Sequence, residues 1–211
     1  MWIQRLLSAL VVAAGFLAAG AVRAETAPDA LVKQVSNEVI DAVKADKAIQ
    51  AGDVQRINAL VDAKVMPHVN FQRMTAASVG RYWRNATPEQ QKRLQDEFKT
   101  LLVRTYAGAL TQVKEQTTVQ LKPMRSQPGD TEVVVRTEVR NSSGEPIQLD
   151  YRLEKAADTW RVYDINVGGI WLVEQYRNSF AQEIGANGMD SLIAKLAEKN
   201  KNAAAAKPAK G

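Results

Sequence analysis

The sequence holds few of the side chains that carry out acid–base, nucleophilic or metal chemistry. His68, beside Pro67, is its one histidine, and it has no cysteine. Histidine clusters and thiolate metal sites are therefore excluded, and a Ser-His-Asp triad would have to be built around His68. We interpret His68 as structural or solvated, and we expect no catalytic residue, no metal and no cofactor.

One carboxylate is in a position to act as a general base. Asp164 follows Val162 on a predicted strand, so its side chain could share the interior face of that strand. With Tyr151 or Tyr163 as a hydrogen-bond donor, it would form the kind of pair used by a ketosteroid-isomerase-like enzyme. We favour a structural role, in which Asp164 caps or hydrogen-bonds the turn region at Gly168.

The usual signals for binding phosphate or nucleic acid are also missing. Gly168-Gly169 lacks the further glycines and the Lys-Ser/Thr of a phosphate loop, and we interpret it as a strand-to-helix turn. The formal net charge is +5, but the basic residues are dispersed and are not interleaved with aromatic ones. The charge can favour encounters with anionic surfaces, yet the pattern indicates no nucleic-acid partner.

The N-terminal residues have the pattern of an export signal. Arg5 precedes the apolar stretch 6–22, and Val22-Arg23-Ala24 places small residues where signal peptidase requires them. We expect residues 1–24 to be a cleaved signal peptide. The absence of cysteine excludes a lipoprotein anchor behind that signal.

The remaining chain is expected to form one domain followed by a tail. Residues 25–200 carry the apolar periodicity of a folded unit. Residues 201–211, which are Ala, Lys, Asn, Pro and Gly, are expected to be a disordered basic tail. We expect a monomer, because no coiled-coil seam or spare apolar helix is evident.

Apolar residues at helical spacing predict helices in both halves of the domain. The clearest start is Thr87-Pro88-Glu89-Gln90, which combines a hydroxyl cap, a proline at the first helical position and a glutamine three residues after the cap. Further helices are predicted over 29–49, from 54 to Pro67, behind a cap at Asn70, over 170–184 and after Gly188.

Between these helices the period of the pattern changes to two. Val133, Val135, Thr137 and Val139 alternate with polar or solvent-facing positions, and Ile147, Leu149, Tyr151 and Leu153 do the same. A third strand is predicted from Thr159 to Val167 and a shorter one around Val119. The pattern predicts an α+β fold with two layers, in which helices pack on a curved antiparallel sheet of about four strands.

Several of these segments resemble the MlaC family, the toluene-tolerance or phospholipid-binding component of the Mla ABC transport system. The resemblance spans about 29–200. Its most specific blocks are Val69-Asn-Phe-Gln-Arg-Met74, Gly80-Arg-Tyr-Trp-Arg-Asn-Ala-Thr-Pro-Glu-Gln-Gln91, Phe98-Lys-Thr-Leu-Leu102, Trp160-Arg-Val-Tyr-Asp-Ile-Asn-Val167 and Tyr176-Arg-Asn-Ser-Phe180.

The resemblance implies a periplasmic phospholipid carrier that is not an enzyme. Such a carrier would enclose acyl chains between helices and sheet and leave the headgroup largely exposed. It would exchange lipid with an outer-membrane MlaA lipoprotein–porin complex and with an inner-membrane MlaD-containing ABC transporter, and so maintain outer-membrane lipid asymmetry.

The apolar stripes then indicate which residues contact the acyl chains. For the sheet wall we predict Val133, Val135, Val139, Ile147, Leu149 and Tyr151. For the helical wall we predict Phe98, Leu101, Leu102, Tyr106, Trp171, Tyr176 and Phe180. Arg81 and Arg84 are candidates for the rim that meets the phosphate of the headgroup.

Two other functions remain compatible with the pattern. One is the ketosteroid-isomerase-like enzyme described above, and the other is a protein-binding periplasmic adaptor with a filled core. Periodicity alone does not separate a filled core from a hollow one.

Overall fold

The computed structural model describes residues 26–127, 129–141, 145–157 and 159–205. The predicted signal peptide lies outside these residues, and so do residues 206–211 of the predicted tail.

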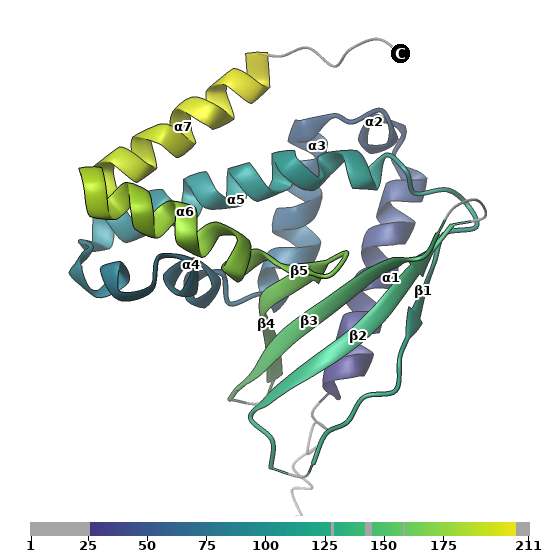
Figure 1. The fold of residues 1–211 in the computed structure, drawn as a ribbon. Coiled ribbons are helices and arrows are strands. Elements are labelled where there is room, and N and C mark those ends of the chain that lie inside the picture. The colour runs from purple at the N-terminus through teal and green to yellow at the C-terminus, as the bar shows by residue number, and fades with distance from the viewer. Residues whose placement is uncertain (1–25, 128, 142–144, 158, 206–211) are drawn as a thin grey trace, which may run out of the picture.

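An antiparallel sheet forms one layer of the domain. Its strands lie side by side in chain order: β1 (Thr118–Leu121), β2 (Glu132–Arg140), β3 (Ile147–Ala156), β4 (Thr159–Val167) and β5 (Ile170–Trp171). The predicted α+β class is confirmed, and Figure 1 shows the twisted sheet beside the helices. The fifth strand corrects the sequence pattern, which assigns Ile170 and Trp171 to a helix, whereas the structure pairs them with β4.

The register gives the sheet one apolar and one polar face. Residues that lie opposite each other on antiparallel strands share a face, and Tyr151 lies opposite both Val135 and Ile165. The face that they share, which we call the inner face, also carries Val119, Leu121, Val133, Thr137, Val139, Ile147, Leu149, Leu153, Val162 and Val167. The opposite, outer face carries Glu132, Arg136, Asp150, Arg152 and Glu154. The predicted alternation is therefore confirmed.

Seven α-helices are present among the described residues. They are α1 (Pro28–Ala45), α2 (Lys47–Gln50), α3 (Val54–Leu60), α4 (Phe71–Val79), α5 (Pro88–Leu110), α6 (Leu172–Asn187) and α7 (Met189–Ala205). Short helical turns, η1 (Val61–Val65), η2 (Met66–His68) and η3 (Gly80–Asn85), connect α3 to α5 around α4. Helix α7 continues to Ala205, past residue 201, where the sequence predicts the tail to begin.

Side-chain caps fix several of these helix starts. Asp46, Asp53 and Asn70 each accept a hydrogen bond from a backbone N–H in the first turn of the helix that follows. At α5 the capping box is complete, because the Thr87 hydroxyl accepts from Gln90 N at 3.2 Å while Gln90 Oε1 accepts from Thr87 N at 3.0 Å. The predicted start of α5 is confirmed, as is the cap at Asn70.

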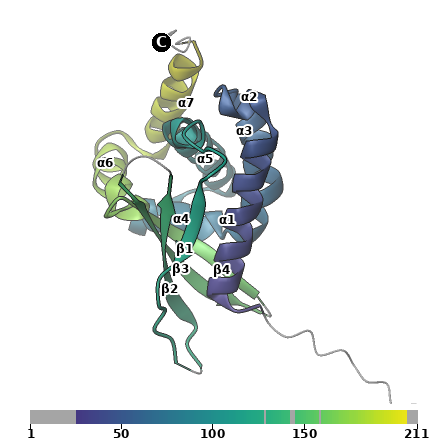
Figure 2. The ribbon, with the colours of Figure 1, turned by 90° about the vertical axis from the view of Figure 1, so that its right-hand side faces the viewer.

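The helices cover the inner face from two sides. Helix α1 contacts β1 and β2, whereas α4 and α6 contact β4. Helix α5 packs against α3, α4 and α7. Figure 2 shows α1 running along one side of the sheet, with α5 and α7 beyond its upper end.

The buried apolar residues of the described part of the chain form three clusters. The sheet cluster joins α1 to β2, β3 and β4 through Leu31, Val32, Val133, Val135, Leu153, Trp160 and Val162. The helix cluster joins the four helices α4, α5, α6 and α7, and it includes Phe98, Leu101, Val173, Phe180 and Leu196. A third cluster, with Val43, Ile57, Leu60 and Val103, joins α1, α3 and α5. Val69 and Ile165, which are partly buried, pack against both the sheet cluster and the helix cluster.

An ion pair between the last two helices gives a pH-dependent contribution to stability. The Glu183 carboxylate on α6 accepts hydrogen bonds from Lys195, Ser191 and Asn187, of which the last two span 2.6 and 3.0 Å. Led by the hydrogen bond from Lys195, these contacts lower the pKa of Glu183 from 4.5 to about 2. A carboxyl whose pKa is lower in the folded state stabilises that state above its unfolded pKa and loses the effect as the pH falls through the folded value.

We therefore expect the stabilisation by Glu183 to disappear between pH 4.5 and about pH 2. The free energy of unfolding of the wild type should exceed that of Glu183→Gln near neutral pH, and the two should converge at the acidic end. Urea denaturation followed by circular dichroism across this range measures the difference. Glu198→Gln, at an exposed position of α7, is the control, and a difference that does not change with pH would contradict the prediction.

Candidate functional site

The inner face of the sheet is fully buried at one end and accessible at the other. At the buried end Val135 and Leu153 have no exposed surface. Further along the same ladders, Leu149 and Val167 lie opposite each other and are only half-buried. An inward-facing aliphatic residue in a filled two-layer core would be covered by the other layer. The helical layer therefore covers this end of the sheet incompletely.

The two large hydrophobic residues that are exposed among the described residues lie at this same end. Ile147 is 42% exposed and Ile170 is 56% exposed. Ile147 is opposite Val139, and Ile170 is opposite Val167, so both belong to the inner face by register. We call Val139, Ile147, Leu149, Val167 and Ile170 the accessible end of the inner face.

On the helical side, three of the predicted wall residues pack against one another. The Phe98 ring lies 5.0 Å from the Tyr176 ring and 5.3 Å from the Phe180 ring, both edge to face, and 5.8 Å from Phe71. Such arrangements are the favourable ones for aromatic rings. Phe98 and Phe180 are buried, so they form the core of the helical layer, while Tyr176 is half-buried at its border.

Three tyrosines place hydroxyl groups within this largely apolar interior. Burial raises the pKa of Tyr106, Tyr151 and Tyr176. For Tyr151 the neighbouring side chains of Ser36, on α1, and Thr137 partly offset that rise through hydrogen bonding. Tyr151 therefore brings a polar group to the place where α1 crosses the sheet. The sequence reasoning missed Ser36 and Thr137 as polar neighbours, although Thr137 interrupts a run of valines.

Most of the predicted wall residues fall into two groups. Val133, Val135, Val139, Ile147, Leu149 and Tyr151 share the inner face, and Phe98, Leu101, Leu102, Tyr176 and Phe180 share the helix cluster or its border. Tyr106 is half-buried and interacts electrostatically with Tyr176. Their contact with acyl chains stays a prediction.

Trp171 does not join either group. It lies opposite Asn166, which in turn lies opposite Asp150, so the register assigns Trp171 to the outer face. The guanidinium of Arg152 lies over the Trp171 ring, with its central carbon 3.9 Å from the ring centroid. The physical reason is the short strand β5, which delays the start of α6 to Leu172 and so changes the direction of the Trp171 side chain.

Arg81 and Arg84, the predicted headgroup rim, lie elsewhere. Both are exposed on η3, whose main contacts are with α4 and α6, and the hydroxyl of Tyr82 approaches α6 near its end at Gly185. Arg81 donates a hydrogen bond to that hydroxyl at 3.3 Å. The structure does not bring these arginines to the accessible end of the inner face.

Two open surface hollows lie away from the accessible end. One, of about 450 Å³, is lined by Val69, Asn70, Phe71, Gln72, Gln95, Ala156 and Arg161. The other, of about 260 Å³, is lined by Ala27, Pro28, Ser126, Gln127, Gly129, Asp130, Val133, Lys155 and Trp160. Among the predicted wall residues, only Val133 contributes to either hollow, so neither coincides with the predicted site.

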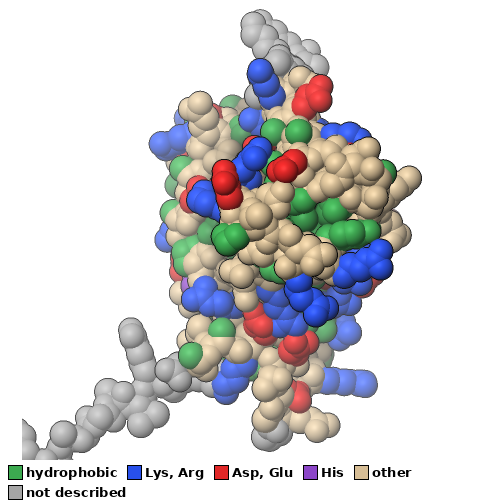
Figure 3. Space-filling view, turned by 90° about the vertical axis from the view of Figure 1, so that its left-hand side faces the viewer, with side chains coloured by type: hydrophobic (Ala, Val, Ile, Leu, Met, Phe, Trp, Pro, Cys, Tyr) green, Lys and Arg blue, Asp and Glu red, His purple; other side chains and the backbone are tan. Residues whose placement is uncertain are grey.

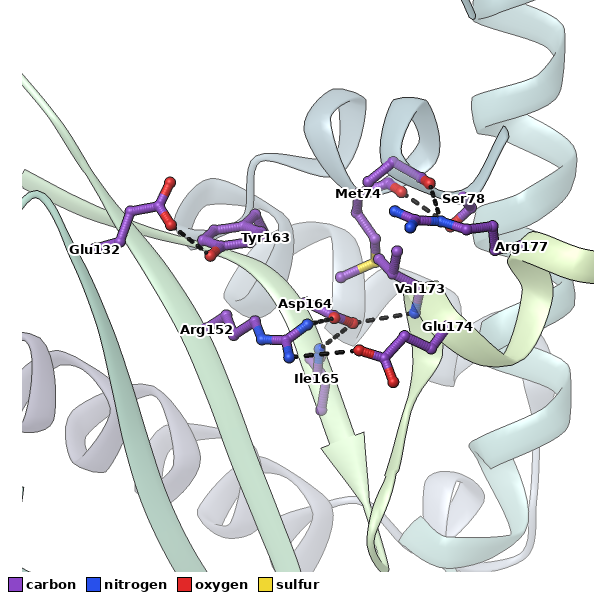
Figure 4. A network of polar contacts seen from close by, with 11 residues as sticks. Met74, Ser78, Glu132, Arg152, Tyr163, Asp164, Ile165, Val173, Glu174 and Arg177 are labelled. Carbon is purple, nitrogen blue, oxygen red and sulfur yellow. Dashed lines mark hydrogen bonds and ion pairs between the residues drawn. The ribbon is translucent and has the colours of Figure 1, made fainter. Parts of the chain in front are cut away.

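The outer face of the sheet carries a network around Arg152. Its guanidinium donates to Asp164 Oδ2 at 2.9 Å and to Glu174 Oε1 at 3.5 Å, and it lies over the ring of Trp171. Asp164 Oδ1 accepts from the backbone N–H groups of Ile165 at 2.9 Å and Val173 at 3.1 Å. Figure 4 shows the hydrogen bonds of Arg152 and Asp164, with Asp164 between Arg152 and the start of α6. We call Arg152, Asp164, Trp171 and Glu174 the Arg152 node.

The position of Asp164 does not support the alternative in which it faces the interior, and its structural hydrogen bonds come from Ile165 N and Val173 N, not from the turn at Gly168. The register shifts between Arg152 and Leu153, so Val162 lies opposite Leu153 while Asp164 lies opposite Arg152. This irregularity places Val162 on the inner face and Asp164 on the outer face. Burial raises the pKa of Asp164, and hydrogen bonds from Val173 and the charge of Arg152 oppose the rise. Its carboxylate caps α6, which is a structural role, and it does not point toward the inner face as the general base of an isomerase would.

Other site types find little support in the described part of the chain. It contains no group of three or more His, Cys, Asp or Glu side chains that could hold a metal ion. None of its helices is both long enough and apolar enough to cross a membrane. Figure 3 shows the side of the molecule that carries α4 and α6, where a group of hydrophobic side chains lies above Lys and Arg side chains.

Comparisons with known proteins agree with one another. The family model described as "MlaC protein" matches residues 33–198. The intermembrane phospholipid transport system binding protein MlaC of Haemophilus influenzae is 24% identical over 86% of each chain. The toluene tolerance protein ttg2D of Pseudomonas putida is 28% identical over 77% of this chain and 75% of its own.

A solved structure gives the same result in three dimensions. The phospholipid-binding protein of Ralstonia solanacearum, determined in complex with a phospholipid, is 46% identical and superimposes with a TM-score of 0.80. The match covers 83% of this chain and 98% of that one.

Proposed function

This chain belongs to the MlaC family, and we propose that it is a periplasmic phospholipid carrier. Residues 1–24 direct export and are then removed, and the mature protein acts as a monomer. The acyl chains of the lipid lie between the inner face of the sheet and the helices, and they enter at the accessible end. The headgroup stays near solvent at that end.

The energetics of acyl chains in water require such an enclosure. Burying one CH₂ group is worth about 0.8 kcal/mol, so leaving a 16-carbon chain in water costs on the order of 12 kcal/mol, and two chains about twice that. A carrier must cover most of both chains with apolar surface and confine polar groups to the opening.

The observation that carries the proposal is the accessible end of the inner face. Val139, Leu149 and Val167 face the helical layer and keep accessible surface, and the exposed Ile147 and Ile170 border them. Apolar surface that stays accessible on the inner face of the sheet supports the binding of an apolar ligand there. The 46% identical relative that was solved with a phospholipid supports the same assignment.

We further propose that the protein exchanges lipid with two membrane complexes. One is an outer-membrane MlaA lipoprotein–porin complex, and the other is an inner-membrane MlaD-containing ABC transporter. Carriage between them would maintain the lipid asymmetry of the outer membrane. The carrier keeps the acyl chains of the lipid away from water. The exchange needs no covalent chemistry, metal or cofactor from this chain.

Mass spectrometry of the protein purified from the periplasm tests the proposal. We expect organic extraction of the folded protein to release phospholipids in an amount comparable to that of the protein. A periplasmic protein without a lipid site, purified in the same way, measures the background. Phospholipid at or below that background would contradict the proposal and favour the adaptor with a filled core.

A further inference from the structure

All the contacts of the Arg152 node connect the centre of β3 to one segment of the chain. Arg152 lies on β3, whereas Asp164 lies in the second half of β4, Trp171 directly before α6 and Glu174 in its first turn. The Arg152 side chain thus contacts the last part of β4, the residue before α6 and the first turn of α6. Asp164 is only 1% exposed, so its ion pair with Arg152 is shielded from solvent on one side.

The segment held in this way borders the proposed lipid site. Between Asp164 and Trp171 it carries Val167 and Ile170, two residues of the accessible end of the inner face. Directly after Glu174 it continues into the part of α6 that carries Tyr176. We call residues 164–174 the lip segment. It presents polar contacts to the outer face and apolar side chains to the inner face.

Beyond the end of β4, few backbone contacts keep the lip segment in place. Strand β5 has only two residues and pairs with β4 at two positions. The turn between the strands, Gly168-Gly169, has φ values of 58° and 94°, which glycine adopts without strain. Besides the node, hydrogen bonds from Gly169 N to Asn166 Oδ1 and from Gly168 N to Gln148 O secure the turn.

The first turn of α6 depends on the node as well. A helix start leaves backbone N–H groups without partners inside the helix, and Trp171 at the N-cap position makes no side-chain cap. Asp164 Oδ1 supplies the missing acceptor at Val173 N, and its negative charge is favourable at a helix N-terminus. Arg152 holds that carboxylate in place, so the two residues act on α6 together.

We propose that the Arg152 node positions the lip segment and thereby sets the rate at which phospholipid enters and leaves the site. Arg152 and Asp164 are positioning residues, because they act on the lipid through Val167, Ile170 and α6 and do not contact it. This inference rests on the proposed function as a phospholipid carrier.

The chain provides a matched control in Arg73. Its guanidinium also lies on an aromatic ring, that of Tyr163 at 3.6 Å, and also pairs with two carboxylates, Glu154 and Glu132. Its side chain is 33% exposed, compared with 31% for Arg152. However, its partners lie outside the lip segment, on β2, on β3 and at Tyr163 of β4. Loss of Arg73 removes a similar set of contacts from a different part of the same face.

The test compares lipid exchange by Arg152→Gln, Asp164→Asn and Arg73→Gln. Each protein is loaded with phosphatidylglycerol that carries a fluorescent acyl chain, and transfer to vesicles of phosphatidylethanolamine and phosphatidylglycerol is followed in time. We expect Arg152→Gln and Asp164→Asn to transfer lipid at least about ten times faster than the wild type, because each variant loses a charge-assisted contact. Arg73→Gln should transfer at about the wild-type rate.

Thermal unfolding and hydrogen exchange separate positioning from a general loss of stability. In the folded Asp164→Asn protein, the amide of Val173 should exchange faster, while amides of α5 keep their protection. If Arg152→Gln does not fold, Asp164→Asn, which keeps the shape of the side chain, decides the question. Wild-type transfer rates in both node variants, or equal acceleration by Arg73→Gln, would overturn the proposal. Failure of the wild type to load any phospholipid would instead overturn the proposed function.

Discussion

Replacing Leu149 by glutamate is expected to remove phospholipid from the protein. Leu149 is half-buried at the accessible end of the inner face, where it lies opposite Thr137 and Val167. A carboxylate there would have to lose its hydration when an acyl chain covers it, which costs several kcal/mol. A cost of about 3 kcal/mol corresponds to more than a hundredfold weaker binding. The lipid that co-purifies with the variant should therefore fall to background.

Val134→Glu is the matched control for this experiment. Val134 is also half-buried and lies on the same sheet, but it is opposite Arg152 on the outer face. The same change of residue type should leave lipid content near that of the wild type. Mass spectrometry measures the lipid, and circular dichroism verifies that both variants are folded. Unchanged lipid in a folded Leu149→Glu protein would exclude the inner face as the acyl-chain site.

Local signals were sufficient to predict most of the secondary structure. The capping box at Thr87 and the cap at Asn70 are chemical patterns within four residues, and both form as expected. The alternation of Val133, Val135 and Thr137 predicts which side of β2 is buried, because successive side chains of a strand point to opposite faces. Such features depend on near neighbours in the chain, so the sequence contains what is needed to recognise them.

Features that depend on strand register were not predictable in the same way. One additional residue near Tyr163 shifts the pairing of β3 and β4, and it places Asp164 on the face opposite to that of Val162. The two-residue strand at Ile170 depends on pairing with β4, and it turns Trp171 away from the predicted wall. The alternating pattern contains no sign of either event, because a bulge changes the face without changing residue type.

The candidate site illustrates the same division. Residues of the sheet wall were found because one face of a strand can be read from alternate positions. The rim was predicted from the arginine-rich sequence around Tyr82, but η3 folds against α4 and α6, and the accessible end of the inner face lies on other elements. Which end of a sheet stays open depends on how far the helices extend over it, and this is a property of tertiary packing.

Replacing Phe98 by alanine is expected to remove a large part of the stability of the fold. Phe98 has no exposed surface, and its ring contacts those of Phe71, Tyr176 and Phe180. Truncation of a buried phenylalanine removes its transfer free energy and leaves a cavity, at a typical total cost of about 3–5 kcal/mol. Urea denaturation followed by circular dichroism should show a lower midpoint with an unchanged slope.

The comparison with Leu102→Ala separates the core of the helical layer from the lipid site. Leu102 is on the same helix, one turn after Phe98, and it is half-buried at the border of the helix cluster. Its truncation removes less buried surface, so the loss of stability should be smaller, while the lipid content should fall if Leu102 contacts acyl chains. Phe98→Ala should show the reverse order, a large loss of stability with a smaller fall in the lipid content of the molecules that remain folded, because Phe98 has no exposed surface. Equal losses of stability in the two variants would mean that α5 buries both residues in one filled core, and the helical wall of the site would then have to be assigned to other residues.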